Sequence, residues 1–423
     1  MIVIEFKAYG KQKQYDAMDE AIRTANFIRN KCIRHWMDNQ GIKKTDLSAL
    51  CAVLAQEFSF ANELNSMARQ ASAERAWLSI SRFYKNCQKK VPQKGFPRFK
   101  KHSRSVEYKT TGWSLCPDKK SISFLDKKNI GKLRLKGKWD LWRLNIKLIK
   151  RVRIVRRADG YYVQFCVKTD IVEELEATGK TIGLDVGLKD FYTDSNGNSQ
   201  PNPRFYRKGE KRLKFHQRRV SRKKKGSANR KKAINRLGKT HLKISRQREE
   251  HAKRLARCVI RSNDLVAYEN LVVKNLVKNH CLAKSINDAG WYKFRKWIEH
   301  FGTKFGRITV AVNPAYTSQN CSNCGEVVKK SLSTRTHVCQ CGCQLDRDHN
   351  AAIIILNRAL STVGHTETWI LNPNARGDLV STLIGENLLK QAESLNQESP
   401  SMQERGVSKV FYSYCSEQPP KAM

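Results

Sequence analysis

A cluster of cysteines that runs directly into an acidic segment most constrains how this chain can fold. Five of the 13 cysteines fall within 23 residues, in a polar, lysine-rich context unlike that of core cysteines. Cys321 and Cys324 form one pair, and Cys339 and Cys341 form a second after fourteen intervening residues. Four thiolates in two close pairs are what tetrahedral zinc needs to cross-link two turns. We therefore predict one structural Zn²⁺ on these four residues.

Two further features bear on the zinc ligands. A glycine follows the second cysteine of each pair, Gly325 and Gly342, and frees the turn backbone to curl around a metal. The second pair is shorter than a two-residue knuckle, so the fourth ligand stays open. Cys343 is a fifth thiol that could replace Cys339, and His337 is a weaker competitor.

The charge of the chain points to a polyanionic partner. Its 423 residues carry 81 Lys and Arg against 38 Asp and Glu, a net charge of +43. Nucleic acid is the expected partner of such a surface. Residues 204–257 alone hold 23 Lys and Arg and three acids, so we expect this segment to lie against phosphates.

A membrane role is not expected. No apolar run approaches the roughly 20 residues that span a bilayer. The N-terminus resembles a strand rather than a signal peptide, because Glu5 and Lys7 interrupt its apolar residues. Outside the cluster the cysteines are scattered singly, which indicates a reducing compartment. We expect an intracellular protein.

Residues 1–178 are predicted to form a small β-barrel that carries a helical insertion at about 12–92. Apolar residues recur at helical spacing within the insertion, and short β-branched runs follow it. The expected strands include 122–124, 133–135, 152–155 and 161–167. Four aromatic residues are expected to pack in the core rather than to stack on bases: Trp77, Phe83, Tyr84 and Trp113.

Residues 179–360 are predicted to form an α/β domain. Its expected strands are 181–186, 190–194, 265–269 and 308–312, with amphipathic helices between them, the basic segment 204–257 and the cysteine ribbon 317–345. The tail, 361–423, is rich in Asn, Ser, Gln and Glu, and we expect it to be disordered.

Three carboxylates are candidates for a second metal site. Asp185 and Glu269 each lie at the end of an apolar strand, and Asp348 starts an apolar helix directly after the ribbon. If the strands are neighbours and the helix packs across them, the three oxygens can hold two Mg²⁺ or Mn²⁺ ions. Two such ions hydrolyse phosphodiesters by activating water and stabilising the leaving oxygen. Asp346 is the rival third ligand.

Two neighbours of Asp348, Arg347 and Asn350, are expected to support the carboxylates from behind.

Taken together, these motifs resemble those of TnpB, the RNA-guided endonuclease of small bacterial insertion sequences and a relative of type V CRISPR effectors. The similarity covers roughly residues 1–360. The segments that carry it are GLDVGLKDFYTDSNG, AYENLVVKNL, TSQNCSNCG with CQCG, LDRDHNAA, FPRFKK and VRIVRRADGYYVQF.

The resemblance implies an RNase H-like RuvC nuclease domain with an inserted zinc ribbon, with Asp185, Glu269 and Asp348 as its catalytic triad, and a wedge-like N-terminal barrel with a recognition insertion. It also implies a guide RNA derived from the transposon end, double-stranded target DNA, and recognition of a short motif beside the target. No protein partner is required, and the implied location is the cytoplasm of a prokaryote, in association with the nucleoid.

Two other functions remain open from the sequence. A transposase that performs strand transfer would use the same three acids and two metals. A non-catalytic nucleic-acid-binding regulator would use only the zinc and the basic helices.

Overall fold

The computed structural model describes all residues except 1, 138–144, 169–172, 174, 332–333 and 364–423. The predicted disordered tail, 361–423, therefore lies almost wholly outside the described residues. The chain divides into two compact units, Met1–Asp170 and Ile171–Met423, and each is described by itself.

Within the described part of the first unit, seven strands form one antiparallel sheet, in the order β2-β6-β7-β1-β5-β4-β3. Strand β1 is central, because it pairs with β7 over most of its length and with β5 at its end. The strands are β1 (Ile2–Tyr9), β2 (Ser105–Tyr108), β3 (Trp113–Leu115), β4 (Ser121–Phe124), β5 (Gly131–Lys136), β6 (Ile149–Arg157) and β7 (Gly160–Val167). All four strands predicted for this region are confirmed.

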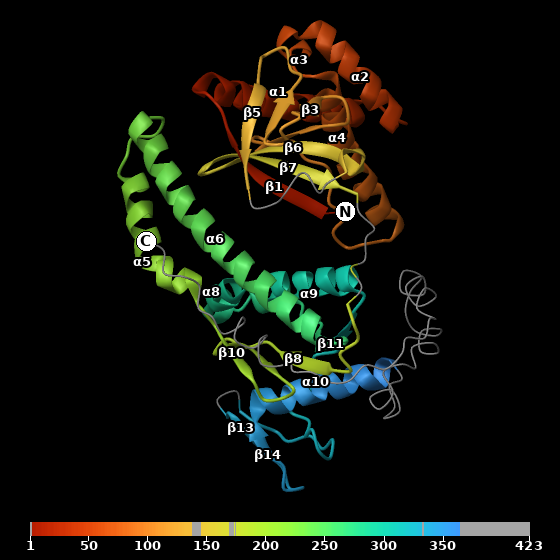
Figure 1. The fold of residues 1–423 in the computed structure, drawn as a ribbon, viewed down its shortest axis with the longest axis vertical. Helices are drawn as coiled ribbons and strands as arrows, with labels where there is room; N and C mark the ends of the chain where they lie inside the picture. The colour runs from red at the N-terminus through yellow and green to blue at the C-terminus, as the bar shows by residue number, and fades with distance from the viewer. Residues whose placement is uncertain (1, 138–144, 169–172, 174, 332–333, 364–423) are drawn as a thin grey trace. The chain divides into compact units, whose positions relative to one another are not determined.

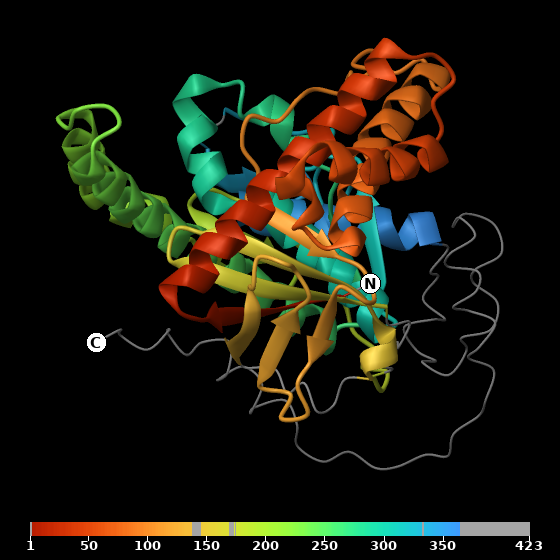
Figure 2. The same ribbon diagram turned by 90° about the horizontal axis from the view of Figure 1, so that it is seen from above.

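This sheet is strongly coiled. Figure 2 shows the orange strands β3 to β5 running across the yellow strands β6 and β7. The two edges of the sheet are β2 and β3, and no pairing joins them among the described residues. Closure into a barrel therefore stays a prediction.

The predicted helical insertion lies between β1 and β2. It consists of α1 (Gln12–Asp38), α2 (Lys44–Glu57), α3 (Ser59–Asn62) and α4 (Ser66–Gln88). A 3₁₀ turn, η2 (Ile146–Leu148), precedes β6. The helices bury one stripe each, as Met18, Ile22, Ala25 and Ile28 of α1 show, and share one core with the inner face of the sheet.

The aromatic residues of this unit mostly pack as predicted. Trp113 is buried, and Trp77 and Phe83 lie against the same core. Tyr84 differs, because 44% of its surface is exposed. It sits at the rim of an aromatic cluster, where its hydroxyl accepts the indole N–H of Trp36 at 2.8 Å.

Within its described residues, the second unit is built on a five-stranded sheet in the order β10-β9-β8-β11-β12. Strands β8, β11 and β12 are parallel, and β9 is antiparallel to β8. The strands are β8 (Thr181–Asp185), β9 (Asp190–Asp194), β10 (Ser199–Pro201), β11 (Leu265–Glu269) and β12 (Ile308–Val312). Four of these match the predicted strands within one residue.

Helices cover both faces of this sheet. The core on one face includes residues of α6 and α9, and the core on the other includes residues of α10. The helices are α5 (Phe205–Ser221), α6 (Ala228–Ser262), α7 (Val273–Leu276), α8 (His280–Ala289), α9 (Trp291–Phe305) and α10 (Arg347–Val363). Between β12 and α10, a hairpin of β13 (Thr336–Val338) and β14 (Gln344–Asp346) belongs to the cysteine ribbon.

Helices α5 and α6 contain most of the basic segment 204–257 and lie side by side, projecting from the sheet (Figure 1). The buried residues of α6 begin only at Ile244, so its first half is exposed or half-buried. Each of the two helices exposes one apolar side chain among its cations, Phe215 of α5 at 55% and Ile234 of α6 at 50%. In the part of the chain that the structure describes, none of the helices has the length and apolar character needed to cross a bilayer.

Candidate active site and metal centre

Asp185 and Glu269 lie at the carboxyl ends of two neighbouring parallel strands. The last paired residues of β8 and β11 are Leu184 and Tyr268, so the two carboxylates follow at equivalent positions. Both side chains are half-buried. The sequence placed each acid at a strand end, and the pairing of β8 with β11 makes them neighbours.

The alternation of side chains sets which face of the sheet these acids use. Leu265 and Ala267 of β11 pack against Ile355 and Ala359 of α10. Glu269 is two residues further along the strand, so it lies on the same face, at the end of the stripe that α10 covers.

Gly183 establishes the same for Asp185. A Cβ at Gly183 would lie 2.2 Å from the carbonyl oxygen of Ala352 and 2.8 Å from the backbone nitrogen of Leu356, so the backbone of α10 rests directly on β8. Asp185 is two residues beyond Gly183 and therefore also faces α10. Asp348 lies one helical turn before Ala352.

The charges of Glu269 and Asp348 act on the Asp185 carboxyl. Burial raises the pKa of the Asp185 carboxyl well above its ordinary value, and the negative charges of Glu269 and Asp348 raise it further. Burial also raises the pKa of Glu269, although a hydrogen bond from the Thr317 hydroxyl opposes the shift. No donor reaches the Asp185 carboxylate among the described residues. This is an environment that a cation would relieve.

Asp348 differs from the other two acids in forming ion pairs with cations. Arg347 Nε lies 3.2 Å from one carboxylate oxygen and Arg335 Nη1 lies 3.4 Å from the other. Its rival Asp346 has a different task, because its Oδ1 accepts the backbone N–H groups of Asp348 at 2.9 Å and His349 at 3.3 Å. Asp346 thus caps helix α10, and Asp348 is the better placed third acid.

The support predicted for Asn350 is wrong in its target. The Asn350 side chain is fully buried, accepts the Ser322 N–H at 2.9 Å and donates to the Asn320 carbonyl at 2.7 Å. It ties α10 to the first cysteine turn rather than supporting the carboxylates. The residue that supports Glu269 is Thr317, which the sequence did not single out because a lone threonine in a loop carries no signal.

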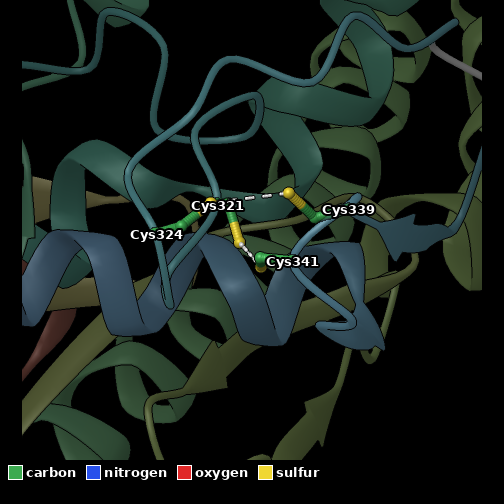
Figure 3. A group of neighbouring side chains, drawn as sticks. All are labelled: Cys321, Cys324, Cys339 and Cys341. Atoms are coloured by element: carbon green, nitrogen blue, oxygen red, sulfur yellow. Dashed lines mark hydrogen bonds between the residues drawn. The ribbon is translucent and has the colours of Figure 1, made fainter.

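The four predicted zinc ligands form a compact group (Figure 3). Their sulfur atoms all lie within 4.8 Å of one another, with Cys321 and Cys341 at 3.6 Å and Cys324 and Cys339 at 3.5 Å. Zn–S bonds of about 2.3 Å imply sulfur separations near 3.8 Å in a tetrahedron. The group therefore fits one zinc ion.

The turn glycines behave as predicted. Gly325 and Gly342 have φ of 81° and 84°, a conformation that L side chains rarely adopt. Each donates its N–H at 3.0 Å to the carbonyl of the first cysteine in its pair. The short second pair thus still makes a tight turn.

Cys343 and His337 form a second group with Cys321, also within 4.8 Å. His337 is fully buried, and its Nδ1 contacts the ammonium of Lys330. An ammonium can only donate, so Nδ1 accepts and the proton of the neutral ring sits on Nε2. In this tautomer Nε2 has no lone pair to offer a metal ion, and it has no hydrogen-bond partner within the described residues. Cys343 remains the competitor for the fourth position.

Within the described residues, only these two cysteine groups bring three or more ligand atoms within 4.8 Å. Glu269 and Asp348 are close enough to Asp185 to raise its pKa, but the three carboxylates do not form a group within 4.8 Å.

Comparison with known proteins matches two segments to family models. Residues 164–280 match the OrfB_IS605 family, described as "Probable transposase", and residues 291–355 match the Cas12f1-like TNB domain. The chain is 37% identical over 207 residues to a "Putative RNA-guided DNA endonuclease" of Streptomyces pristinaespiralis. That match covers 48% of this chain and 51% of the relative.

A second relative is the "Putative RNA-guided DNA endonuclease InsQ" of Escherichia coli K12, at 28% identity over 62% of this chain and 67% of the relative. A cryo-EM structure of a Cas12f1–sgRNA–target DNA complex matches with a TM-score of 0.52 and 14% identity, over 82% of this chain and 83% of that one. The chain belongs to the TnpB family.

The two segments that match family models together contain every predicted site residue. Residues 164–280 include Asp185 and Glu269, and residues 291–355 include Asp348 and the four cysteines. The structural match shows a fold similar to that of the Cas12f1 chain. The Streptomyces match spans about half of the relative, so it does not by itself transfer the activity of the whole protein.

Proposed function

We propose that this TnpB-family protein is an RNA-guided DNA endonuclease that hydrolyses phosphodiester bonds of target DNA at Asp185, Glu269 and Asp348. One observation carries the proposal. Burial and the negative charges of Glu269 and Asp348 raise the pKa of Asp185 well above its ordinary value, and no hydrogen-bond donor reaches its carboxylate within the described residues. Such an arrangement is unfavourable without cations and is typical of divalent metal sites.

The residues present fit two Mg²⁺ or Mn²⁺ ions. Carboxylate oxygens are the preferred ligands of these hard cations. When bound, the ions supply an activated water and a stabilised leaving oxygen.

The chain's own residues prepare this site in three ways. Burial of Asp185 and Glu269 strengthens their attraction for cations. The Thr317 hydroxyl, itself buried, fixes one oxygen of Glu269 and leaves the other for an ion. Arg335 and Arg347 contact the two oxygens of Asp348 and orient the carboxylate.

The zinc ribbon contributes to the site through α10. Strand β14 ends at Asp346, and the next residue begins α10. Asn350 joins the same helix to the first cysteine turn, so a zinc ion held by Cys321, Cys324, Cys339 and Cys341 would fix the start of α10 and with it Asp348.

The proposed partners are a guide RNA derived from the transposon end and double-stranded target DNA with a short adjacent motif. The names of the relatives and the net charge of +43 support this. The exposed cations of the α5–α6 hairpin offer a surface for phosphates, and pairing to the guide would supply specificity.

The decisive experiment uses the full chain purified with the RNA that accompanies it. Cleavage of DNA matched to that RNA should require Mg²⁺ and should disappear in Asp185→Ala. Asp190→Asn, which changes a neighbouring acid on β9, should cleave like the parent. Metal-dependent cleavage that ignores the guide would refute guided recognition. If the parent does not cleave while Asp185→Ala binds nucleic acid unchanged, the non-catalytic regulator is correct.

A strand transferase is the second candidate, because the description of the matching family names a transposase. Incubation with donor transposon ends and a target plasmid separates the two. Joined donor and target strands would favour transfer, whereas free 3′ and 5′ ends without joining favour hydrolysis.

A further inference from the structure

The outward face of strands β1 and β5 carries cations that form no ion pair within the described residues. In β5, Leu133 and Leu135 are buried, whereas Lys132, Arg134 and Lys136 are exposed on the opposite face. Such alternate positions are roughly 6.8 Å apart along an antiparallel strand. Three cations are therefore evenly spaced along one face of β5, which is labelled in Figure 1.

Strand β1 continues this surface. Its register with β5 places Lys7 directly opposite Lys136, and Tyr9 opposite Arg134. Like charges directly opposite each other in a sheet are destabilising. No ion pair involves Lys7 or the three cations of β5 within the described residues. We call Lys7, Tyr9, Lys132, Arg134 and Lys136 the cationic strip.

Some cations on other strands of this sheet are paired with acids. Glu5, on the same face of β1 as Lys7, pairs with Arg157. Glu107 likewise binds Arg151 and Arg153, each at 2.7 Å. The cations of the strip, in contrast, form no ion pair within the described residues.

Tyr9 gives the strip an aromatic centre. Its ring is 37% exposed, and the Lys7 ammonium and the Arg134 guanidinium lie 5.7 and 6.0 Å from its centroid. An exposed ring flanked by cations suits a nucleotide, since the base can stack on the ring while the cations meet phosphates. A membrane surface would favour apolar side chains in place of the single ring.

We propose that the cationic strip binds the phosphodiester backbone of a nucleic acid and that Tyr9 stacks on one of its bases. This deepens the proposed function, because it names a surface that holds the guide or the target. The phosphate chemistry is common to RNA and DNA, and the binding experiment distinguishes them.

The test measures binding by the full chain in buffer without added Mg²⁺ or Mn²⁺, so that cleavage does not contribute while zinc is retained. The probes are labelled single-stranded RNA, single-stranded DNA and duplex DNA of one sequence. The variant K132Q/R134Q/K136Q removes three outward cations and leaves Leu133 and Leu135 in place. K85Q/K89Q/K94Q is the matched control, because it removes the same charge from exposed positions at the end of α4 and beyond it.

We expect the strip variant to lower the slope of log Kd against log salt by about 2 for single strands, at about 0.7 per phosphate contact. The control should keep the parent slope. The probe whose binding falls most identifies RNA or DNA as the ligand. Equal slopes for the strip variant and the control, or no binding of any probe by the parent, would overturn the inference.

Tyr9 has its own pair of variants. Tyr9→Ala should weaken binding of the preferred probe roughly five-fold to a hundred-fold, and Tyr9→Phe should bind like the parent because stacking needs only the ring. Equal losses in both variants would exclude stacking. These outcomes are independent of cleavage. If the parent cleaves with its guide but the strip variant binds as well as the parent, only this inference is refuted. If binding depends on the strip but the parent never cleaves, only the proposed function is refuted.

Discussion

Gly183 of β8 lies against Ala352 of α10 so closely that a Cβ on the glycine would be 2.2 Å from the Ala352 carbonyl oxygen. The obstacle is helix backbone rather than a flexible side chain. The distance between the sheet and the helix therefore depends on a residue without a side chain. The same distance sets the position of Asp348 relative to Asp185.

Gly183→Ala should therefore displace α10 and weaken the site from a distance. We expect a loss of about 1–3 kcal/mol in the free energy of unfolding, as for other overpacked cores, and a fall in cleavage larger than that in nucleic-acid binding. Gly209→Ala is the control, because its Cβ would meet only the end of the Ile244 side chain. Urea unfolding and guided cleavage check the pair. Unchanged stability of Gly183→Ala would contradict the close packing.

Asp185→Asn should stabilise the metal-free protein while removing its response to metal. The raised pKa means that the folded protein disfavours the ionised form of Asp185, so a neutral amide should increase the free energy of unfolding of the metal-free protein. The parent should be further stabilised by millimolar Mg²⁺, and the variant much less. Unfolding with EDTA or Mg²⁺ measures both. A less stable variant that still responds fully to Mg²⁺ would argue against an ion at Asp185.

Loss of zinc should disturb the carboxylate site as well as the ribbon. Cys339→Ser should reduce bound zinc well below one equivalent, lower the melting temperature and reduce cleavage, because β14 leads directly into α10. Cys343→Ser should retain one equivalent if the four predicted cysteines are the ligands. Metal analysis of both variants decides the fourth ligand, and the opposite result would assign it to Cys343.

His251 should make the fold sensitive to mild acid. Phe191 and Phe205 meet its ring edge-to-face, with centroids 4.9 and 5.8 Å away, and burial lowers its pKa from 6.5 to about 4. The folded protein keeps this imidazole neutral while the unfolded chain takes up a proton below about pH 6.5. Stability is therefore present above pH 6.5 and lost as the pH falls toward 4, by up to about 3 kcal/mol.

The check is the pH dependence of unfolding for His251→Phe, which should be flatter than that of the parent between pH 6.5 and 4. His241→Gln changes an exposed histidine on the same helix and should leave the profile as it is. Identical profiles for parent and His251→Phe would show that this imidazole does not titrate across folding.

Local patterns in the sequence were sufficient for the main elements. Strands β8, β9, β11 and β12 were predictable from short β-branched and apolar runs. The cysteine pairs with their glycines indicated two metal-binding turns. These features depend on side chains near one another in the chain, which is why they can be recognised without a fold. The acids were also found as strand-end and helix-start residues.

The way these strands, helices and turns come together follows from the tertiary structure. The pairing of β8 with β11 brings Asp185 beside Glu269, and the contact between Gly183 and Ala352 sets α10 over them. The roles of Thr317 and Asn350, and the cap that separates Asp346 from Asp348, rest on hydrogen bonds that are not legible in a linear pattern. The unpaired face of β1 and β5 joins residues more than a hundred positions apart. Such proximity comes from register and packing, which depend on the whole chain at once.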